Sequence, residues 1–279
     1  MMTMTQRLRR QRIVSYTLLV LISLFFIVPL IWMILTALKS PEELVQGVLI
    51  PTQLRFDNFI KALQTIPFFQ YTINSFYYAF FAAIGVVISS TLVAYAFAKL
   101  EWPGRDKWFL VMIATIVIPA QVIQIPLYIL YNNLGWLDSY NPLIIPAYFA
   151  VGAAANIFLL RQVYLSIPQS LLESARMDGA GDFHIFRTIM LPLARSMIVV
   201  IGIISFMNFW NDFYNPLLYI TTTDYFPLAY GIRAFATQYS NQYNLMMAAA
   251  LVITVPSLIL FFIAQRQIVD SVAQTGIKG

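Results

Sequence analysis

The segment NFWNDFYN, residues 208–215, groups aromatic rings, carboxamides and one carboxylate within a short stretch. Aromatic faces can stack on the apolar faces of sugar rings, while carboxamides and carboxylates form hydrogen bonds with hydroxyl groups. Asp212 is also an ionisable residue inside an apolar run, which makes it a functional candidate by default. The segment predicts part of a path for a polar solute, and its candidate residues are Asn208, Trp210, Asn211, Asp212 and Tyr214.

The same segment has a structural explanation, which the residues alone leave open. Tyr and Trp gather at membrane interfaces, and Asn and Asp cap the ends of helices. Gln121, Gln124 and Asn132 are further candidates for the path, in an apolar run upstream. Gln121 and Gln124 are equally suited to hydrogen bonds between neighbouring helices. Lining of a path and packing of helices therefore remain alternatives for these side chains.

Residues that commonly carry catalysis or hold metals are scarce. The chain has a single histidine, His184, and no cysteine, so it lacks a Ser/His/Asp set and a Cys or multi-histidine metal site. It also lacks the G-x-x-x-x-G-K-[ST] loop that cradles phosphates, so we expect no nucleotide site. We place His184 at a surface or an interface. The sequence predicts no catalytic residue, no metal and no cofactor bound by this chain.

The composition indicates a lipid environment. Apolar residues make up 60% of the 279 and charged residues only 10%, against roughly 25% charged residues in soluble domains. Such a chain has too few polar side chains to cover a core in water. The net charge of +5 does not indicate nucleic acid, because no cluster of Lys and Arg alternates with aromatic residues on one face.

Six apolar runs predict membrane-spanning helices. A helix rises about 1.5 Å per residue, so about 20 residues cross the roughly 30 Å hydrocarbon core. The predicted spans are 13–38, 73–98, 108–131, 143–160, 197–218 and 245–264. The rest divides into a cytoplasmic N-terminus (1–12), an external loop with short helices (39–71) and a cytoplasmic tail (266–279), around a core of 72–265. We therefore expect an all-α integral membrane protein.

The distribution of basic residues predicts the orientation. An even number of spans places both ends on one side, and loops rich in Lys and Arg stay in the cytoplasm. With the N-terminus inside, only four of the 17 Lys and Arg residues fall outside: Lys39, Arg55, Lys61 and Arg233. The sequence predicts a multi-pass protein with both termini in the cytoplasm. No convincing internal repeat is visible, which argues mildly against inverted-repeat secondary transporters.

Between the fourth and fifth spans lies a charged, helix-patterned segment, Arg161–Ser196. Two capping boxes compete for the start of its first helix. A box of Ser166 and Gln169 leaves Glu173 free to face a partner, whereas a box of Ser170 and Glu173 ties Glu173 to its own backbone. Both registers are open from the local pattern.

The second half of this segment predicts a turn and another helix. Gly179 and Gly181 favour a sharp reversal, because glycine accepts the left-handed conformation that ends helices. Asp182 is suited to cap a second helix with the apolar stripe Phe183, Phe186 and Met190, and Pro192 is expected to end it. The predicted product is two short helices at an angle, outside the membrane.

The residues of this segment resemble the EAA loop of ABC importer permeases, which reads Glu-Ala-Ala, three residues, Gly, nine residues, Ile-x-Leu-Pro. The matching positions are Glu173, Ser174, Ala175, Asp178, Gly179, Ala180, Ile189, Leu191 and Pro192. Ser174 stands where the family usually has alanine, which is a change of one small residue for another. The EAA loop is then residues 166–195, in the cytoplasm between spans four and five.

The resemblance covers nearly the whole chain, and most specifically residues 72–279. The WNDF segment at 210–213, the LKS ending of the first span and the terminal Gly276–Gly279 resemble the maltose-type carbohydrate branch of these importers. The tail is less glycine-rich here than in the family, so a second contact with the ATPase through residues 272–279 is implied more weakly.

The resemblance implies a division of work between subunits. The loop would form a coupling helix that docks into a cleft of a cytoplasmic ATPase subunit, so ATP and Mg would be bound by that partner and not by this chain. Glu173 would pair with a basic group, Ala175 would permit close docking, and Gly179 would supply the turn. The implied partners are a second homologous permease, two ATP-binding cassette subunits, an extracellular or periplasmic solute-binding protein and a carbohydrate. The implied location is a bacterial or archaeal plasma membrane.

Other functions remain open on the sequence alone. A stand-alone secondary transporter or channel would move its solute without an ATPase. A membrane-embedded enzyme would need a catalytic set that the residues do not supply. Among ABC permeases, related chains carry glycerol phosphodiesters or other polyols, so the class of solute is also open.

Overall fold

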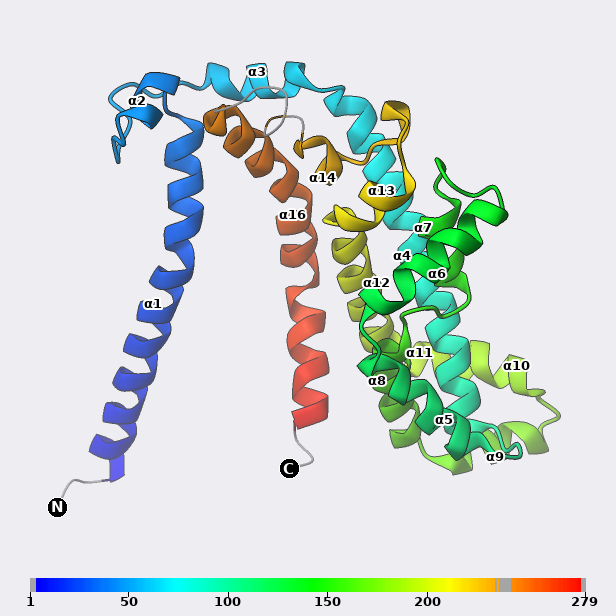
Figure 1. Ribbon diagram of the computed structural model, residues 1–279. Coiled ribbons are helices and arrows are strands. Elements are labelled where there is room, and N and C mark those ends of the chain that lie inside the picture. The colour runs from blue at the N-terminus through cyan, green and yellow to red at the C-terminus, as the bar shows by residue number, and fades with distance from the viewer. Residues whose placement is uncertain (1–3, 234, 236–241, 277–279) are drawn as a thin grey trace. The chain divides into compact units, whose positions relative to one another are not determined.

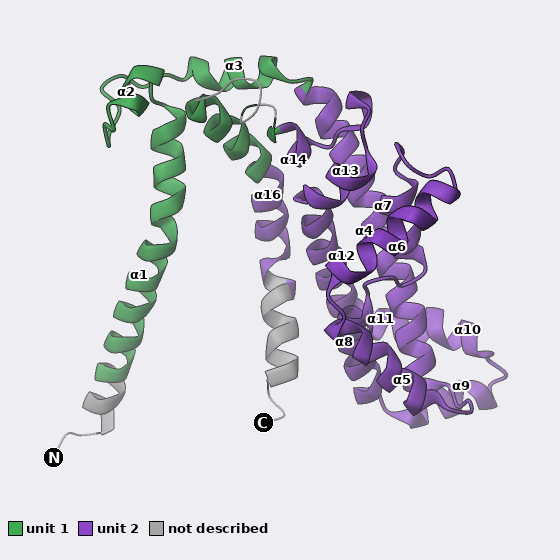
Figure 2. Ribbon diagram, viewed as in Figure 1, with its two compact units in different colours: residues 1–67, 232–254 green, residues 68–231, 255–279 purple. Residues whose placement is uncertain are grey.

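The computed structural model describes residues 4–233, 235 and 242–276, and it is all-helical over that part of the chain (Figure 1). Its residues fall into two compact units (Figure 2). Unit 1 consists of residues 1–67 and 232–254, and unit 2 of residues 68–231 and 255–279.

Unit 1 holds an apolar helix and a tightly hydrogen-bonded loop. Its helices are α1 (Met4–Ala37), α2 (Pro41–Val45), α3 (Asp57–Thr65) and the first part of α16 (Tyr243–Gly276). After α1, the buried Asn58 amide donates to the carbonyls of Ala37 and Lys39 at 2.8 and 2.9 Å. The Asn244 amide at the start of α16 donates to the same Lys39 carbonyl. Two carboxamides thus satisfy the backbone where α1 ends.

A capping box starts α2. The Ser40 hydroxyl accepts from the Glu43 backbone N–H, and the Glu43 carboxylate accepts from the Ser40 N–H at 3.0 Å. The carboxylate also accepts from the hydroxyl and the backbone N–H of Thr52. These hydrogen bonds, the Thr52 hydroxyl first, lower the pKa of Glu43 to about 2. The loop that follows α1 is therefore an ordered connection.

Unit 2 is built around α4 (Phe68–Lys99), which packs against three other helices. Its elements are α5 (Arg105–Ala114), η1 (Thr115–Val117), α6 (Ala120–Asn133), α7 (Asn141–Tyr148), α8 (Ala154–Ser166), α9 (Gln169–Met177), α10 (Asp182–Ile185), the π-helix η2 (Phe186–Met190), α11 (Leu191–Leu193), α12 (Arg195–Trp210), α13 (Tyr214–Tyr219), η3 (Thr223–Tyr225), α14 (Leu228–Gly231) and the rest of α16. The core lies where α7, α8 and α12 meet α4.

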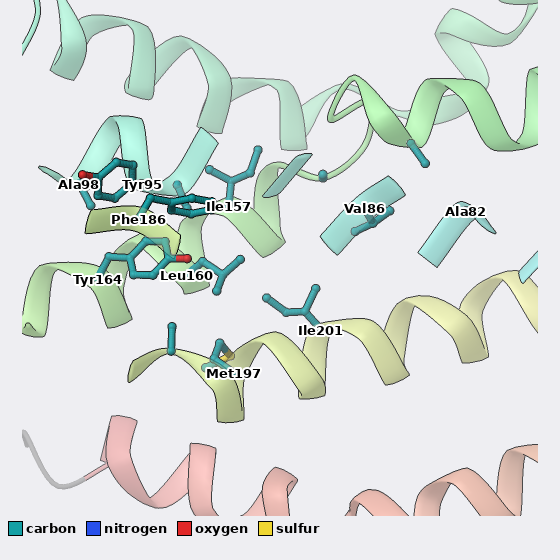
Figure 3. Packing of buried hydrophobic residues seen from close by; sticks show 14 of the residues in the cluster. Ala82, Val86, Tyr95, Ala98, Ile157, Leu160, Tyr164, Phe186, Met197 and Ile201 are labelled. Atoms are coloured by element: carbon teal, nitrogen blue, oxygen red, sulfur yellow. The ribbon is translucent and has the colours of Figure 1, made fainter. Parts of the chain in front are cut away.

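Small residues allow this close packing. A methyl group added to Gly85 of α4 would lie 2.7 Å from a ring atom of Tyr148 and 3.1 Å from the Ala147 side chain, both in α7. Ala82 and Ala94 of α4 are fully buried. Figure 3 shows Val86 and Ile201 filling part of the space between α4 and α12. The small residues that the sequence spreads through α4 thus let neighbouring backbones approach.

Three helices in the described part of the chain are long and apolar enough to cross a membrane: Arg10–Ala37, Phe68–Lys99 and Tyr243–Gln265. Two bent pairs raise the number to as many as five: Arg105–Val117 with Ala120–Asn133, and Asp182–Leu193 with Arg195–Trp210. The three long helices contain the predicted spans 73–98 and 245–264 and all of 13–38 except Leu38, since α1 ends at Ala37. The tail continues α16 as far as Gly276, and residues 277–279 lie outside the described residues.

The predicted span 143–160 is wrong as a continuous helix. The chain leaves α7 at Tyr148, turns, and begins α8 only at Ala154. Ala150 and Gly152 in the turn have φ values of 60° and 73°, in the left-handed region that stops a right-handed helix. The uncharged composition could not reveal this turn, because alanine at Ala150 is a good helix former.

The predicted span 108–131 is also broken, between η1 and α6, with a bend of 98°. Pro119 lacks a backbone N–H and pushes the preceding residue into extended geometry, and Ile118 has φ −72° and ψ 117°. Pro126, by contrast, lies inside α6. The run 197–218 divides in the same way into α12 and α13, with a break after Trp210.

Candidate functional site

The turn after α9 has the hydrogen bonds of a Schellman motif. The Ala180 N–H donates to the Ala175 carbonyl at 2.9 Å, and the Gly179 N–H donates to the Arg176 carbonyl at 3.0 Å. Gly179 has φ 86°, in the left-handed region. The reversal that the glycine spacing predicts is therefore present, and Gly179 is the residue that makes it.

The helix that follows begins one residue earlier than predicted. Gly181, in extended geometry, is the N-cap of α10, and Asp182 is its first helical residue. The prediction that Asp182 caps this helix is therefore wrong. Asp182 instead forms an ion pair with Arg176, with 3.0 Å between the Oδ1 and Nη2 atoms. This pair closes the turn by joining α9 to α10 across Gly179.

Neither predicted capping box starts α9. Pro168 occupies the N-cap position, since its fixed φ suits a helix start. Ser166 is the last residue of α8 and donates to the Val163 carbonyl of its own helix. Ser170 lies inside α9 rather than at its cap. Glu173 is exposed, so its carboxylate lies on the outer face of α9 and is not committed to the helix start.

Buried apolar side chains anchor the turn and its two helices to the rest of unit 2. Leu172 of α9, Ile185 of α10 and Met190 of η2 are fully buried. Phe186 packs against Tyr95 of α4, with 5.2 Å between ring centroids (Figure 3). Phe183 is 69% exposed, so its predicted place in the apolar stripe is wrong and Ile185 takes that place.

Two hydrogen bonds from α4 fix the segment further. The buried Lys99 ammonium donates to the Ile167 carbonyl at 2.7 Å, just before α9. The Tyr95 hydroxyl donates to the Asp182 carbonyl at 3.3 Å, just after the turn. The two short helices are thus held at both of their starts by residues near one end of α4, and Figure 1 shows α9 and α10 at that end.

The Ile189-x-Leu191-Pro192 ending continues the helix and does not stop it. Residues 186–190 form a π-helix, and Pro192 lies in the first turn of α11, where a missing N–H is tolerated. The break comes at Ala194, where the ψ angle is 6°, and the helices on either side are bent by 79°. The prediction that Pro192 ends the helix is wrong by two residues.

The outer surface of this segment is hollowed. A cavity of about 490 Å³ opens between α9 and α10, lined by Ala175, Asp178, Gly179, Ala180, Gly181, His184, Thr188 and Ile189. Met177 beside it is 89% exposed. An exposed helix face with an adjoining hollow, anchored from behind by buried residues, can receive a protein partner.

At the other end of unit 2, Asp212 is held by several hydrogen bonds. Its carboxylate accepts from the Tyr78 hydroxyl at 2.7 Å and from the backbone N–H groups of Tyr214 and Asn215 at 3.1 Å each. The Asn215 amide adds a bond of 2.9 Å. Asp212 precedes Phe213, the N-cap of α13, and its carboxylate accepts from the first two backbone N–H groups of that helix.

The other candidates on the path divide between buried and exposed positions. Trp210 is buried and stacks on Phe206 with 5.9 Å between ring centroids. Asn211 is exposed and donates to the Met207 carbonyl, and Asn208 is also exposed. The Tyr214 hydroxyl donates to the Gln124 carboxamide oxygen at 2.8 Å, between α13 and α6.

Sequence reasoning missed Asp138, which ties two loops together. It accepts from the backbone N–H groups of Thr221 and Thr222 at 2.9 and 2.7 Å and from the Thr222 hydroxyl. These hydrogen bonds, the hydroxyl first, lower the pKa of Asp138 to about 2. Its φ is 59°. The polar turn that contains Asp138 is the sequence signal from which this residue could have been identified.

Within the described ranges, no group of three or more Asp, Glu or His side chains is arranged to hold a metal ion. The chemistry available at both ends of unit 2 is hydrogen bonding, ring stacking and protein docking.

Comparison with known proteins decides the family. The family model for the binding-protein-dependent transport system inner membrane component matches residues 90–274. The chain belongs to this family.

The relatives of this permease include transporters of different solutes. It is 33% identical over 269 residues to the diacetylchitobiose uptake system permease NgcG of Streptomyces coelicolor, covering 95% of this chain and 89% of the relative. It is 32% identical over 209 residues to the sn-glycerol-3-phosphate permease UgpE of Salmonella typhimurium, covering 74% and 73%. The first of these is a sugar permease of the kind that the WNDF segment and the tail predict.

The fold of the permease has a solved counterpart. A chain of a bacterial ABC transporter that imports the acidic polysaccharide alginate superposes with a TM-score of 0.80 at 23% identity, covering 95% of this chain and 98% of the other. The predicted membership of the binding-protein-dependent ABC permeases is confirmed, and so is an all-helical membrane fold. The protein is an inner membrane component of a transport system.

Proposed function

We propose that this chain is a permease subunit of an ATP-driven importer and forms half of the translocation path for a carbohydrate that a binding protein delivers. The observation that carries the proposal is the anchored turn at Gly179, which presents α9 on the outside of unit 2 in a chain of this family. The relationship to a diacetylchitobiose permease supports a saccharide as the solute.

In this proposal α9 is the coupling helix. Leu172 holds the inner face of the helix, while Glu173 and Ser174 lie exposed on the outer face. Glu173 pairs with a basic group of the ATPase, and Ala175, half-buried beside the hollow, permits close docking. Movement of the docked ATPase reaches α4 through the hydrogen bonds of Lys99 and Tyr95. The exposed carboxylate supports the pairing, because an uncommitted charge is available to a partner.

The arrangement in the membrane belongs to the same proposal. Six membrane crossings place both termini in the cytoplasm, with the EAA loop between the fourth and fifth. The charge bias of the loops supports this orientation. The broken segment 143–166 then forms the fourth of these crossings, with neighbouring helices covering its turn, since irregular backbone at membrane depth must be buried in protein or face water.

The energy source and the partners lie outside this chain. A second homologous permease completes the path, two ATP-binding cassette subunits bind ATP and Mg, and this chain itself binds no cofactor. An extracellular or periplasmic binding protein supplies the solute, which the family description supports. ATP hydrolysis is then the work of a partner.

Substitution at Gly179 tests the coupling assignment. Alanine at φ 86° is strained by about 1–2 kcal/mol, although a methyl group there would meet nothing within 4 Å. Gly47→Ala is the matched control, because Gly47 has φ 68° and equally open space but belongs to unit 1 rather than to the docking segment. We expect G179A to weaken co-purification with the ATPase and to reduce uptake severalfold, while G47A retains both. If G179A and Glu173→Gln both left association, ATPase activity and uptake intact, the coupling assignment would fail.

A second solute class has an observation in its favour. The 32% identity to the sn-glycerol-3-phosphate permease UgpE keeps a phosphate ester as an alternative. The two solutes differ in charge, so the side chains that face the path can discriminate between them.

A further inference from the structure

One face of α6 carries a row of hydrogen-bonding side chains. Gln121, Gln124, Tyr128 and Asn132 follow one another at spacings of three, four and four residues, which places them on a single face of the helix. Gln121, Tyr128 and Asn132 are exposed, and Gln124 is half-buried. We call these four residues the polar row.

The neighbouring face of α6 is apolar and equally exposed. Val122, Ile125 and Ile129 are 67%, 73% and 54% exposed, at spacings of three and four residues. A helix with two such faces in a membrane protein turns the apolar one toward lipid or an apolar neighbour. The polar row then faces water or a polar partner, because uncompensated polar groups are expensive in hydrocarbon.

The start of α13 forms a frame beside the polar row. The Tyr214 hydroxyl donates to the Gln124 carboxamide oxygen at 2.8 Å, and Tyr214 remains 45% exposed. Tyr128 is 44% exposed, and its ring stacks on Tyr219 with centroids 6.3 Å apart and an interplanar angle of 19°. The row thus combines carboxamides with aromatic rings that are held in place yet accessible.

The surface formed by α6 and α13 carries no positively charged side chain from either helix. Neither α6 nor α13 contains a Lys, Arg or His residue. The ionisable group nearest in sequence to Tyr214 is a carboxylate, Asp212, whose oxygens already accept hydrogen bonds from its neighbours. Phosphates and carboxylates are recognised by Arg and Lys, so an anionic solute would find no counter-charge on these two helices.

We propose that the polar row and Tyr214 form the solute-contacting surface of this permease, and that the surface selects neutral saccharides over anionic solutes. The inference rests on the proposed importer function and narrows its solute class. Sugar hydroxyls bond to the carboxamides of Gln121 and Gln124, and the apolar face of a sugar ring lies on the exposed ring of Tyr128 or Tyr214. A hydroxyl of the solute takes the place of the Tyr214 hydroxyl at Gln124, so the bond seen here is replaced rather than lost.

The test uses the complete transporter, with both permeases, the ATPase pair and the binding protein, reconstituted in proteoliposomes. The neutral probe is diacetylchitobiose, and the anionic probes are sn-glycerol 3-phosphate and an alginate oligosaccharide. Gln124→Ala and Tyr128→Ala are compared with Val122→Ala, a control on the apolar face of the same helix. Uptake is measured against probe concentration, and assembly is measured by co-purification.

We expect uptake of the neutral probe only, with a half-saturating concentration about tenfold higher in Q124A and Y128A, as for the loss of about 1.4 kcal/mol, and unchanged in V122A. Assembly should stay at wild-type levels in all three variants, and V122A, which lies outside the polar row, should also keep wild-type basal ATPase activity. Tyr128→Phe should retain most of the affinity that Y128A loses, because the ring is kept.

Three results would overturn the inference. Uptake of an anionic probe in preference to the neutral one would show that charge selection is wrong. Loss of co-purification with the second permease in Q124A would show that the row is a contact between helices. Unchanged half-saturation in both variants would show that the row does not meet the solute. Failure of the proposed function itself would look different, because the wild-type complex would then take up no probe in response to ATP.

Discussion

Gly179 and Asp138 show how two residues with positive φ serve different purposes. Gly179 ends α9 and leaves the helix face free for a partner. Asp138, with φ 59°, instead directs its carboxylate to the backbone of Thr221 and Thr222. Because Asp tolerates the left-handed region better than most residues with a side chain, one residue can both turn the chain and hold a distant loop.

The carboxylate of Asp138 predicts a pH dependence of the two loops that it joins. Its pKa is lowered to about 2 in the folded protein, against about 3.9 in an unfolded chain. A lowered pKa means that the contribution is present above about pH 4 and is lost as the pH falls through about 2. We expect the protection of the amides of residues 221–222 to fall over that window, as hydrogen exchange measures when each rate is compared with the intrinsic rate at the same pH.

Asp138→Asn provides the control for this prediction. The variant cannot titrate, so exchange at residues 221–222 should be faster at neutral pH and should change less between pH 4 and pH 2. Equal acid sensitivity in the variant and the wild type would assign the effect to another group. Glu43, whose pKa is also lowered to about 2, lies in unit 1, so its protonation would affect a different loop.

At the scale of elements, the packing of α4 on α7 depends on the missing side chain of Gly85. Gly85→Ala would place a methyl group 2.7 Å from the Tyr148 ring, and overpacking of this kind typically destabilises by about 1–3 kcal/mol. Gly202→Ala is the matched control, since its added methyl group meets Val87 at an ordinary 3.4 Å.

Alanine favours a helix over glycine by about 1 kcal/mol, so the two variants should diverge. We expect a lower melting temperature for G85A than for the wild type in detergent, and an equal or higher one for G202A. Equal melting temperatures for the two variants would mean that Tyr148 moves aside without cost and that the contact between α4 and α7 is loose.

A turn or a helix end can be predicted from the sequence only where the residues at that position determine it. The turn at Gly179 follows from glycine, which needs no partner to adopt φ 86°. The turn at Ala150 was not predictable, because alanine is a good helix former and nothing in its type indicates the φ of 60° that it adopts. The cap of α9 was predicted at Ser166 or Ser170, but the neighbouring Pro168 takes the position.

Site residues follow the same rule. Glu173, Gly179 and Pro192 were predicted as site residues through motif spacing, which needs only the chain itself. The partners of Asp212 and Asp138 include Tyr78 and Thr222, more than 80 residues away along the chain. A single sequence gives no sign of such pairs, so the fixed state of both carboxylates is visible only in the fold.

At the scale of the whole molecule, the membrane orientation can be tested directly because the chain contains no cysteine. Lys107→Cys and Leu54→Cys introduce single thiols at exposed positions on opposite predicted sides of the membrane. We expect a membrane-impermeant maleimide to label L54C in intact cells or spheroplasts, and K107C only after the membrane is opened. Labelling of K107C in intact cells would reverse the topology and place the EAA loop outside.

The central claim is that this chain supplies a path and that a partner supplies the energy. Uptake of diacetylchitobiose into proteoliposomes tests it most directly, with the chain alone compared with the complex of both permeases, the ATPase pair and the binding protein. We expect no accumulation by the chain alone and ATP-dependent accumulation by the complex. Accumulation by the chain alone, without the ATPase, would contradict it.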